Sequence, residues 1–148
     1  MLNAYTDGAC SDNQSDKNTG GWAWSIFDNQ SVIEQKSGGE YDTTNNIMEA
    51  KAIYDLIVTH SNDDLRIHTD SELCINWLNG TYKIKVKNER DKIRSHILHE
   101  TIDLIGKRQK NGIKTEFVKI KGHSGHKEND YVDRLAVEQT SILKKNRS

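Results

Sequence analysis

Acidic side chains follow two strand-like segments of this sequence and lie within one helix-like segment. Asp7 comes after the alternating residues 2–6, and Asp70 ends the segment 65–70. Glu49 has apolar residues three, four and seven positions further along the chain, which places its carboxylate on or beside the buried side of a helix. Carboxylate oxygens are the ligands that Mg²⁺ prefers in proteins. If these three side chains converge, they form a site for a divalent cation.

Each of these carboxylates also has an interpretation that requires no chemistry. The pair Asp7-Gly8 is a common turn signal, which predicts that the first strand ends at Asp7 and breaks at Gly8. Glu49 could lie at the edge of the buried stripe, with its carboxylate in water. Asp70 could cap the next helix or stand in its first turn. The positions of the three side chains relative to one another decide between these interpretations.

The order of the predicted elements favours convergence. Strands at 2–7, 22–27 and 31–38 form an antiparallel meander, and a helix from about 43–46 to 59 leads into a fourth strand at 65–70. A strand, a helix and a strand are the pattern of a crossover unit, so the strands of Asp7 and Asp70 are expected to pair in parallel. Neighbouring strands lie about 4.8 Å apart. Two aspartates at matching ends are then close enough to share a cation.

The rest of the chain supplies further elements and a possible fourth carboxylate. Helices are expected at 71–78, from Asn88 or Asp91 to Lys110, and at 128–143, with a fifth strand at 114–120. Asp133 lies in the last of these helices, and Asp130 is a rival for the same role. Between the helices, the segment 81–87 alternates apolar residues with Lys83, Lys85 and Lys87. This alternation predicts either a solvated edge strand protected by lysines or an arm that contacts phosphates.

Composition narrows the class of protein. The chain has 148 residues, 29% of them charged and 34% hydrophobic, with a net charge of −1, which suits one domain over residues 1–148. It contains no apolar run long enough to span a membrane, no export signal and only two cysteines, so we expect a cytoplasmic protein without a membrane partner. We also expect a monomer with no obligatory protein partner. The cysteines are not paired in spacing, which disfavours a zinc site with His123 and His126.

Four segments, in this order and at this spacing, resemble the signature segments of type 1 ribonuclease H. They are Tyr5-Thr-Asp-Gly-Ala-Cys10, Thr43-Thr-Asn-Asn-Ile-Met-Glu-Ala50, His68-Thr-Asp-Ser-Glu72 and Lys121-Gly-His-Ser-Gly-His-Lys-Glu-Asn-Asp-Tyr-Val-Asp-Arg-Leu-Ala136. The resemblance covers nearly the whole chain. It implies an α/β ribonuclease H-like fold with a mixed five-stranded sheet, three antiparallel strands and then parallel strands, flanked by helices. We expect residues 141–148 to form a flexible C-terminal tail.

The resemblance also assigns roles to individual residues. The family's four metal-binding, catalytic carboxylates match Asp7, Glu49, Asp70 and Asp133, the last of which precedes Leu-Ala as in the family. His123 matches a histidine thought to help move protons or products. The positions similar to substrate contacts are Cys10, Asn13, Asn45 and Asn46 on the RNA side, and Thr44 and Asn88 in a pocket for a DNA phosphate. Lys83, Lys85 and Lys87 are candidates for further substrate contacts.

The resemblance implies an endonuclease that hydrolyses the RNA strand of RNA–DNA hybrids with two Mg²⁺ ions, for which Mn²⁺ is expected to substitute. Its products are expected to carry 5′-phosphate and 3′-hydroxyl ends. The alternatives are another nuclease of the same fold and a hybrid-binding module that has lost catalysis. The chain departs from the family where glutamine is common, at Glu72, and in the segment 79–87, which stands in place of a basic helix. Both departures are expected to affect affinity for the hybrid more than chemistry.

Overall fold

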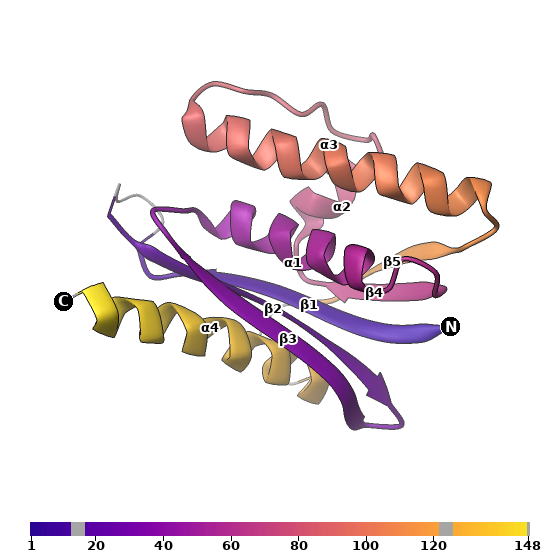
Figure 1. Ribbon diagram of the computed structural model, residues 1–148, viewed down its shortest axis with the longest axis horizontal. Coiled ribbons are helices and arrows are strands. Elements are labelled where there is room, and N and C mark those ends of the chain that lie inside the picture. Colours follow the sequence, from indigo (N-terminus) through magenta and orange to yellow (C-terminus); the bar gives the residue numbers. More distant parts are fainter. Residues whose placement is uncertain (13–16, 122–125, 148) are drawn as a thin grey trace.

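The computed structural model describes residues 1–12, 17–121 and 126–147, and within them it shows a mixed sheet flanked by helices (Figure 1). The strands are β1 (Leu2–Cys10), β2 (Thr19–Asp28), β3 (Ser31–Tyr41), β4 (Leu65–Thr69) and β5 (Thr115–Lys119). The helices are α1 (Asn45–Thr59), α2 (Glu72–Leu78), α3 (Glu89–Lys110) and α4 (Lys127–Arg147). The predicted order of elements is confirmed.

The sheet has the strand order β3-β2-β1-β4-β5. The first three strands pair antiparallel, whereas β1, β4 and β5 are parallel, which confirms the predicted mixed sheet. In the parallel pairing of β1 with β4, Tyr5 is opposite His68. Asp7 and Asp70 each follow that pair by two residues, so the crossover does bring both aspartates to the same edge of the sheet.

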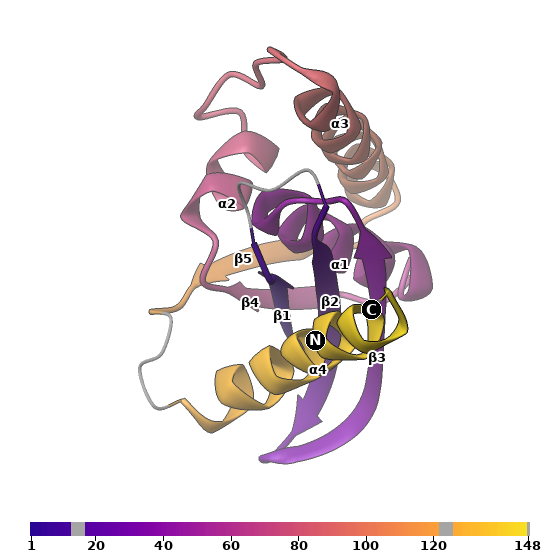
Figure 2. The ribbon, with the colours of Figure 1, turned by 90° about the vertical axis from the view of Figure 1, so that its left-hand side faces the viewer.

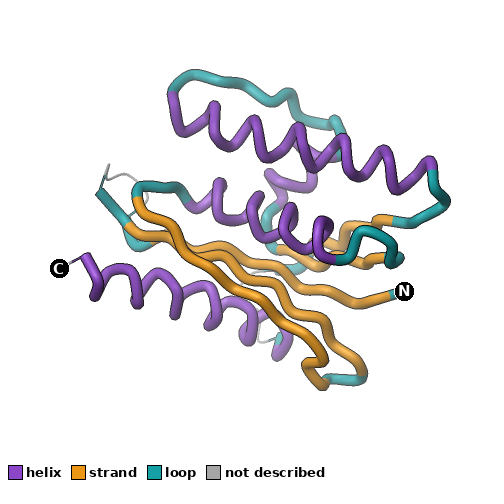
Figure 3. Tube along the Cα trace, in the orientation of Figure 1, coloured by secondary structure: helices purple, strands orange, loops and turns teal. Residues whose placement is uncertain are grey.

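Helices cover both faces of the sheet. α1 packs against β1 and β2 on one face, and α3 lies over α1 as an outer layer, whereas α4 covers β1, β2 and β3 on the other face (Figures 1 and 2). The trace in Figure 3 shows α3 and α1 side by side, with α4 alone below the strands. Glu49 and Asp133 therefore approach the sheet from opposite faces, since they belong to α1 and α4.

The main core lies between α1 and the sheet. The apolar stripe of α1 is fully buried at Met48, Ile53 and Leu56, and it packs against Trp24 and Ile67 from β2 and β4. The Thr44 hydroxyl accepts a hydrogen bond from the Ile47 amide at 3.1 Å and caps the start of the helix. This burial fixes the rotation of α1 about its axis, and with it the direction in which Glu49 points.

On the other face of the sheet, α4 packs directly against the backbone of β2. A side chain at Gly21 would place its Cβ only 1.9 Å from the carbonyl oxygen of Ala136, so only glycine allows α4 to rest on the strand at this point. Nearby, the Thr19 hydroxyl donates to the Thr140 carbonyl at 3.0 Å. These contacts set the height of α4, and therefore of Asp133, above the sheet.

Three predictions of local structure are wrong. β1 does not break at Gly8 but continues to Cys10, with Gly8 opposite Trp22 in β2. The edge strand considered for residues 81–87 does not form, because the backbone there bonds to side chains and to α2 rather than to a neighbouring strand. Arg94 donates to the Lys85 carbonyl, Asp91 accepts from the Lys87 amide, and the Tyr82 amide donates to the Asn76 carbonyl. The expected tail from residue 141 is helical as far as Arg147.

The helical end of α4 has a physical cause. The guanidinium of Arg147 donates to both carboxylate oxygens of Asp42, at 2.9 and 3.1 Å, and to the Asn18 carbonyl. It also lies 4.5 Å from the ring centroid of Tyr41. Tyr41 and Asp42 lie at the end of β3 and Asn18 lies just before β2, so these partners could not be read from the C-terminal sequence alone. Among the described helices, none has the length and apolar composition needed to cross a membrane.

Candidate active site

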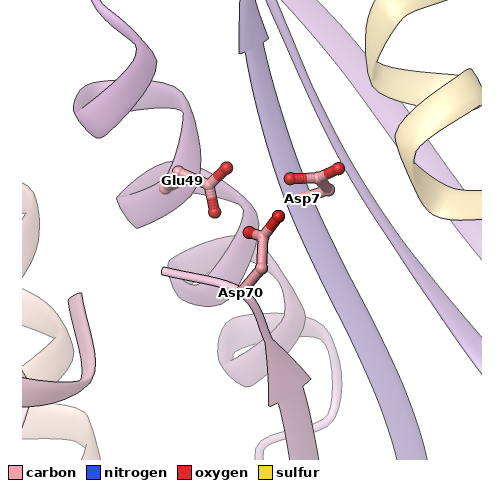
Figure 4. Close-up of side chains that lie close together, drawn as sticks. All are labelled: Asp7, Glu49 and Asp70. Atoms are coloured by element: carbon pink, nitrogen blue, oxygen red, sulfur yellow. The ribbon is translucent and has the colours of Figure 1, made fainter. Parts of the chain in front are cut away.

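Three carboxylates converge where β1, α1 and the end of β4 meet. One ligand oxygen from each of Asp7, Glu49 and Asp70 lies within 4.8 Å of the others. Figure 4 shows the three side chains pointing toward one another from a strand, a helix and the residue that follows a strand. The structure therefore brings together three of the four carboxylates predicted from the sequence as a cation site.

Gly8 makes this convergence possible. Its backbone amide donates to Asp7 Oδ1 at 2.9 Å and to Glu49 Oε1 at 2.8 Å. A side chain here would place its Cβ 2.5 Å from the Glu49 amide nitrogen and 2.7 Å from the Met48 carbonyl carbon, both of them backbone atoms. Gly8 is thus required for the close approach of β1 to α1, and not for the turn that the sequence suggested.

Burial and mutual repulsion hold protons on these groups. Asp7 and Glu49 are each only 3% exposed. Burial raises the pKa of Asp7 to about 8, an effect that the Glu49 hydrogen bond opposes and that Asp70 and Asp133 reinforce. Burial, followed by the charge of Asp7, raises the pKa of Glu49 well above its ordinary value. A bound cation would relieve both effects, because it offsets the charge that burial disfavours.

The donor set fits a divalent metal ion. Glu49 Oε2 is buried and has no hydrogen-bond partner, although a buried carboxylate oxygen is costly to leave unpaired. The three converging side chains offer oxygen atoms only, the chemistry that Mg²⁺ and Mn²⁺ favour. An ion among these oxygens would supply the partner that Glu49 Oε2 lacks.

The fourth predicted carboxylate, Asp133, lies at the rim of the same site. It lines a cavity of about 570 Å³ together with the three converging carboxylates, and its hydrogen bond and charge help to raise the pKa of Asp7. It is not part of the tight cluster within 4.8 Å. Asp130, one turn earlier in α4, is exposed and does not line the cavity, so the geometry favours Asp133 over its rival.

Several predicted substrate contacts lie in the same place. Cys10, Asn45 and Asn46 line the cavity, from the end of β1 and the first turn of α1. Thr44 and Asn88 do not line it; each caps a helix, with the Asn88 side chain accepting from the Asp91 amide at 2.8 Å. Asn13 and His123 lie outside the described residues.

The three lysines form a separate basic surface. Lys83, Lys85 and Lys87 are exposed and line a hollow of about 270 Å³ with Trp77 and Arg94. The Arg94 guanidinium lies over the Trp77 ring, 4.4 Å from its centroid. This stacking and the bonds from Arg94 and Asp91 hold an irregular segment in one shape without strand pairing.

Sequence reasoning missed two apolar residues of the cavity. Leu73 and Val137 line it and are 42% and 43% exposed. Each follows a site carboxylate by about one helical turn, Leu73 after Asp70 and Val137 after Asp133. That spacing is the signal in the sequence that could have found them.

Comparisons with known proteins agree with this geometry. The family model described as RNase H matches residues 1–141. The chain belongs to the RNase H family. Ribonuclease H of Brucella anthropi is 36% identical over 143 residues, covering 93% of this chain and 88% of that protein. Ribonuclease H of Mesorhizobium japonicum is 33% identical over 151 residues, covering 98% and 81%.

Solved structures of RNase H proteins share the fold. RNase H1 from Halobacterium salinarum has a TM-score of 0.71 at 18% identity, covering 95% of this chain and 98% of that one. LC11-RNase H1, isolated from compost and solved in complex with an RNA/DNA hybrid, also has a TM-score of 0.71, at 20% identity and with coverage of 97% and 99%. The resemblance that the four sequence segments carried is therefore confirmed at the level of family and fold.

The raised pKa of Asp7 predicts how the metal-free protein responds to pH. Because the folded-state value of about 8 exceeds the ordinary value of 3.8, the folded protein binds more protons than the unfolded chain between these values. Stability without metal should therefore fall as pH rises from about 4 to 8, by on the order of 5 kcal/mol, since one pKa unit corresponds to about 1.4 kcal/mol. Asp7→Asn should flatten this profile, raise the melting temperature in chelator at pH 8, and gain less from Mg²⁺ than the parent.

The measurement is thermal or urea unfolding across this pH range, in chelator and in Mg²⁺. Asp130→Asn is the matched control, because it removes an exposed carboxylate outside the cavity and should leave the profile unchanged. If Asp7→Asn instead melts at a lower temperature than the parent in chelator, the main role of Asp7 is structural, as the acceptor of the hydrogen bond from the Gly8 amide.

Proposed function

We propose that this protein is an endonuclease that hydrolyses the RNA strand of RNA–DNA hybrids. The observation that carries the proposal is the convergence of Asp7, Glu49 and Asp70 within 4.8 Å in a chain of the RNase H family. The relatives named ribonuclease H and the structural neighbour solved with an RNA/DNA hybrid support the choice of substrate. The open cavity beside the cluster leaves room for a nucleic-acid backbone.

The proposal includes divalent ions as cofactors. Asp7, Glu49 and Asp70 would hold Mg²⁺, with Asp133 completing the site from α4 and Mn²⁺ able to substitute. When bound, two divalent ions supply the charge that activates an attacking water and stabilises the leaving oxygen of an in-line displacement. The expected products then carry 5′-phosphate and 3′-hydroxyl ends.

The protein's own residues have distinct tasks in this scheme. Gly8 holds Asp7 and Glu49 in fixed positions, so the site is organised before substrate binds. Asn45 and Asn46, at the start of α1 and on the cavity, are placed to read the 2′-hydroxyls of an RNA strand, since an amide both donates and accepts hydrogen bonds. Cys10 would lie beside the same groove, and Asn13 is proposed to join these contacts.

Further contacts would bind the phosphates of the DNA strand. Thr44 and Asn88 are the first candidates, because each stands at the start of a helix, where backbone amides favour an anion. Lys83, Lys85 and Lys87 add positive charge on an ordered segment close to Asn88 in the sequence. His123 is proposed to move protons or product at the site without serving as a metal ligand.

A cleavage assay tests the proposed substrate. With Mg²⁺, the protein should cut a labelled RNA–DNA hybrid at internal positions of the RNA strand and leave duplex DNA and single-stranded RNA intact. Asp70→Asn should lose this cleavage, while the control Asp130→Asn should keep it. Equal cleavage of duplex DNA would point to another nuclease of the same fold, and binding without cleavage would point to a silent hybrid-binding module.

The role of His123 can be separated from metal binding. His123→Ala should lower turnover by about 100-fold, the low end of the range for a lost proton-transfer group, while the Mg²⁺ concentration for half-maximal activity stays nearly the same. His126→Ala is the matched control in the same segment and should change neither quantity. A large rise in the required Mg²⁺ for His123→Ala would show that His123 is a ligand instead.

The lysine surface predicts a salt dependence of binding. Replacing Lys83, Lys85 and Lys87 by alanine should weaken hybrid binding and flatten the slope of log K against log salt by up to about 0.9 per lost contact on a B-DNA scale. The matched control replaces Lys107, Lys110 and Lys114, which carry the same charge at the other end of α3 and just beyond it. If both triple variants show the same slope, Lys83, Lys85 and Lys87 do not contact phosphates and are simply solvated surface residues.

A further inference from the structure

Glu72 is the acidic residue of the cavity that the proposed chemistry leaves without a role. It is the first residue of α2, it is exposed, and it lines the cavity that Asp7 and Asp70 also line. It is not part of the metal-site cluster. Among the described residues, none forms a hydrogen bond or ion pair with its carboxylate. Both oxygens are therefore available to a bound molecule.

The chemistry of Glu72 restricts what it can bind. An ionised carboxylate only accepts hydrogen bonds, whereas the amides of Asn45 and Asn46 in the same cavity both donate and accept. A further negative charge beside Asp7 and Asp70 repels a phosphate backbone unless a donor of the substrate meets it. The group of a hybrid that this side chain would favour is therefore a hydrogen-bond donor.

A nucleic-acid minor groove presents few donors. Along an RNA strand each 2′-hydroxyl can donate, but it is present at every nucleotide and distinguishes none from another. Among the base edges of this groove, only the N2 amino group of guanine donates; the other groups there accept. A residue that can only accept thus discriminates guanine from every other base.

We propose, on the basis of the function proposed above, that Glu72 is a specificity-determining residue that accepts a hydrogen bond from the N2 amino group of guanine. The guanine lies in the minor groove at a fixed distance from the phosphodiester that is cut, because Glu72 is fixed on α2 directly after Asp70 and Ser71. Cleavage is therefore fastest at the positions of a hybrid that place guanine opposite Glu72.

Inosine provides the test, because it lacks the N2 amino group of guanine and otherwise keeps the same pairing edge. A set of hybrids of one sequence carries a single inosine at each guanine in turn, on either strand. Cleavage positions and single-turnover rates are measured in Mg²⁺ for the parent, Glu72→Gln and Glu72→Ala. Glu89→Gln is the matched control, since Glu89 is the first residue of α3, is exposed and does not line the cavity.

For the parent, one inosine position should slow cleavage at one phosphodiester by about tenfold, the scale of a lost hydrogen bond to a charged group. Glu72→Ala should cut the guanine and inosine hybrids at equal rates, and Glu89→Gln should keep the tenfold ratio. Glu72→Gln should reduce the ratio to about twofold and bind all hybrids more tightly, because an amide pairs with any base edge and carries no charge.

Two results would overturn the proposal while leaving the proposed function intact. One is cleavage by the parent that no inosine slows at any position; the other is a tenfold ratio that persists in Glu72→Ala. An increased Mg²⁺ requirement of Glu72→Gln with unchanged site preference would make Glu72 a metal ligand and also overturn the proposal. Failure of the parent to cut any hybrid would refute the proposed function, and with it this inference.

Discussion

The site depends on the contact between β1 and α1 at Gly8. One backbone amide there donates to two carboxylates from different elements, and no side chain could be added without collision with the backbone of α1. The strand and the helix are thus held at a separation that leaves Asp7 and Glu49 side by side and almost without water. Every electrostatic property of the site follows from this closeness, because charges in a dry environment interact strongly.

Because the neighbouring carboxylates repel one another, packing elsewhere in the fold has to hold them together. The apolar stripe of α1 is fully buried against the sheet, which fixes Glu49 even though its oxygen Oε2 has no partner. The parallel pairing of β1 with β4 fixes Asp70 in the same way. The hydrophobic core therefore holds together a cluster whose carboxylates would otherwise repel one another, and a bound cation would offset that repulsion.

The sequence was sufficient for the architecture and for the three converging carboxylates. Regular alternation and helical spacing predicted the elements, and the crossover pattern correctly placed the strands of Asp7 and Asp70 next to each other. The sequence was insufficient where contacts between residues far apart in the chain determine the local structure. Gly8 was assigned to a turn because its true neighbour, the backbone at Met48 and Glu49, is 40 residues away. The end of α4 was assigned to a tail because Asp42, which pairs with Arg147, lies more than 100 residues earlier.

The segment after α2 shows a different limit. The alternation of lysines with Tyr82, Ile84 and Val86 is typical of a strand, but pairing requires a free sheet edge beside it. In the structure Ile84 packs against the main core and Arg94 bonds the backbone instead. Periodicity reports which side chains could share a face, and it cannot report whether a partner strand is there.

The placement of α4 has a consequence for how the enzyme is made. The first 70 residues hold Asp7, Glu49 and Asp70, whereas Asp133 lies on α4, which packs on the opposite face of the sheet, where Gly21 leaves room for it. During synthesis, chain order makes Asp7, Glu49 and Asp70 before Asp133, the proposed fourth carboxylate. A chain truncated before α4 would therefore carry Asp7, Glu49 and Asp70 without Asp133, the carboxylate proposed to complete the site.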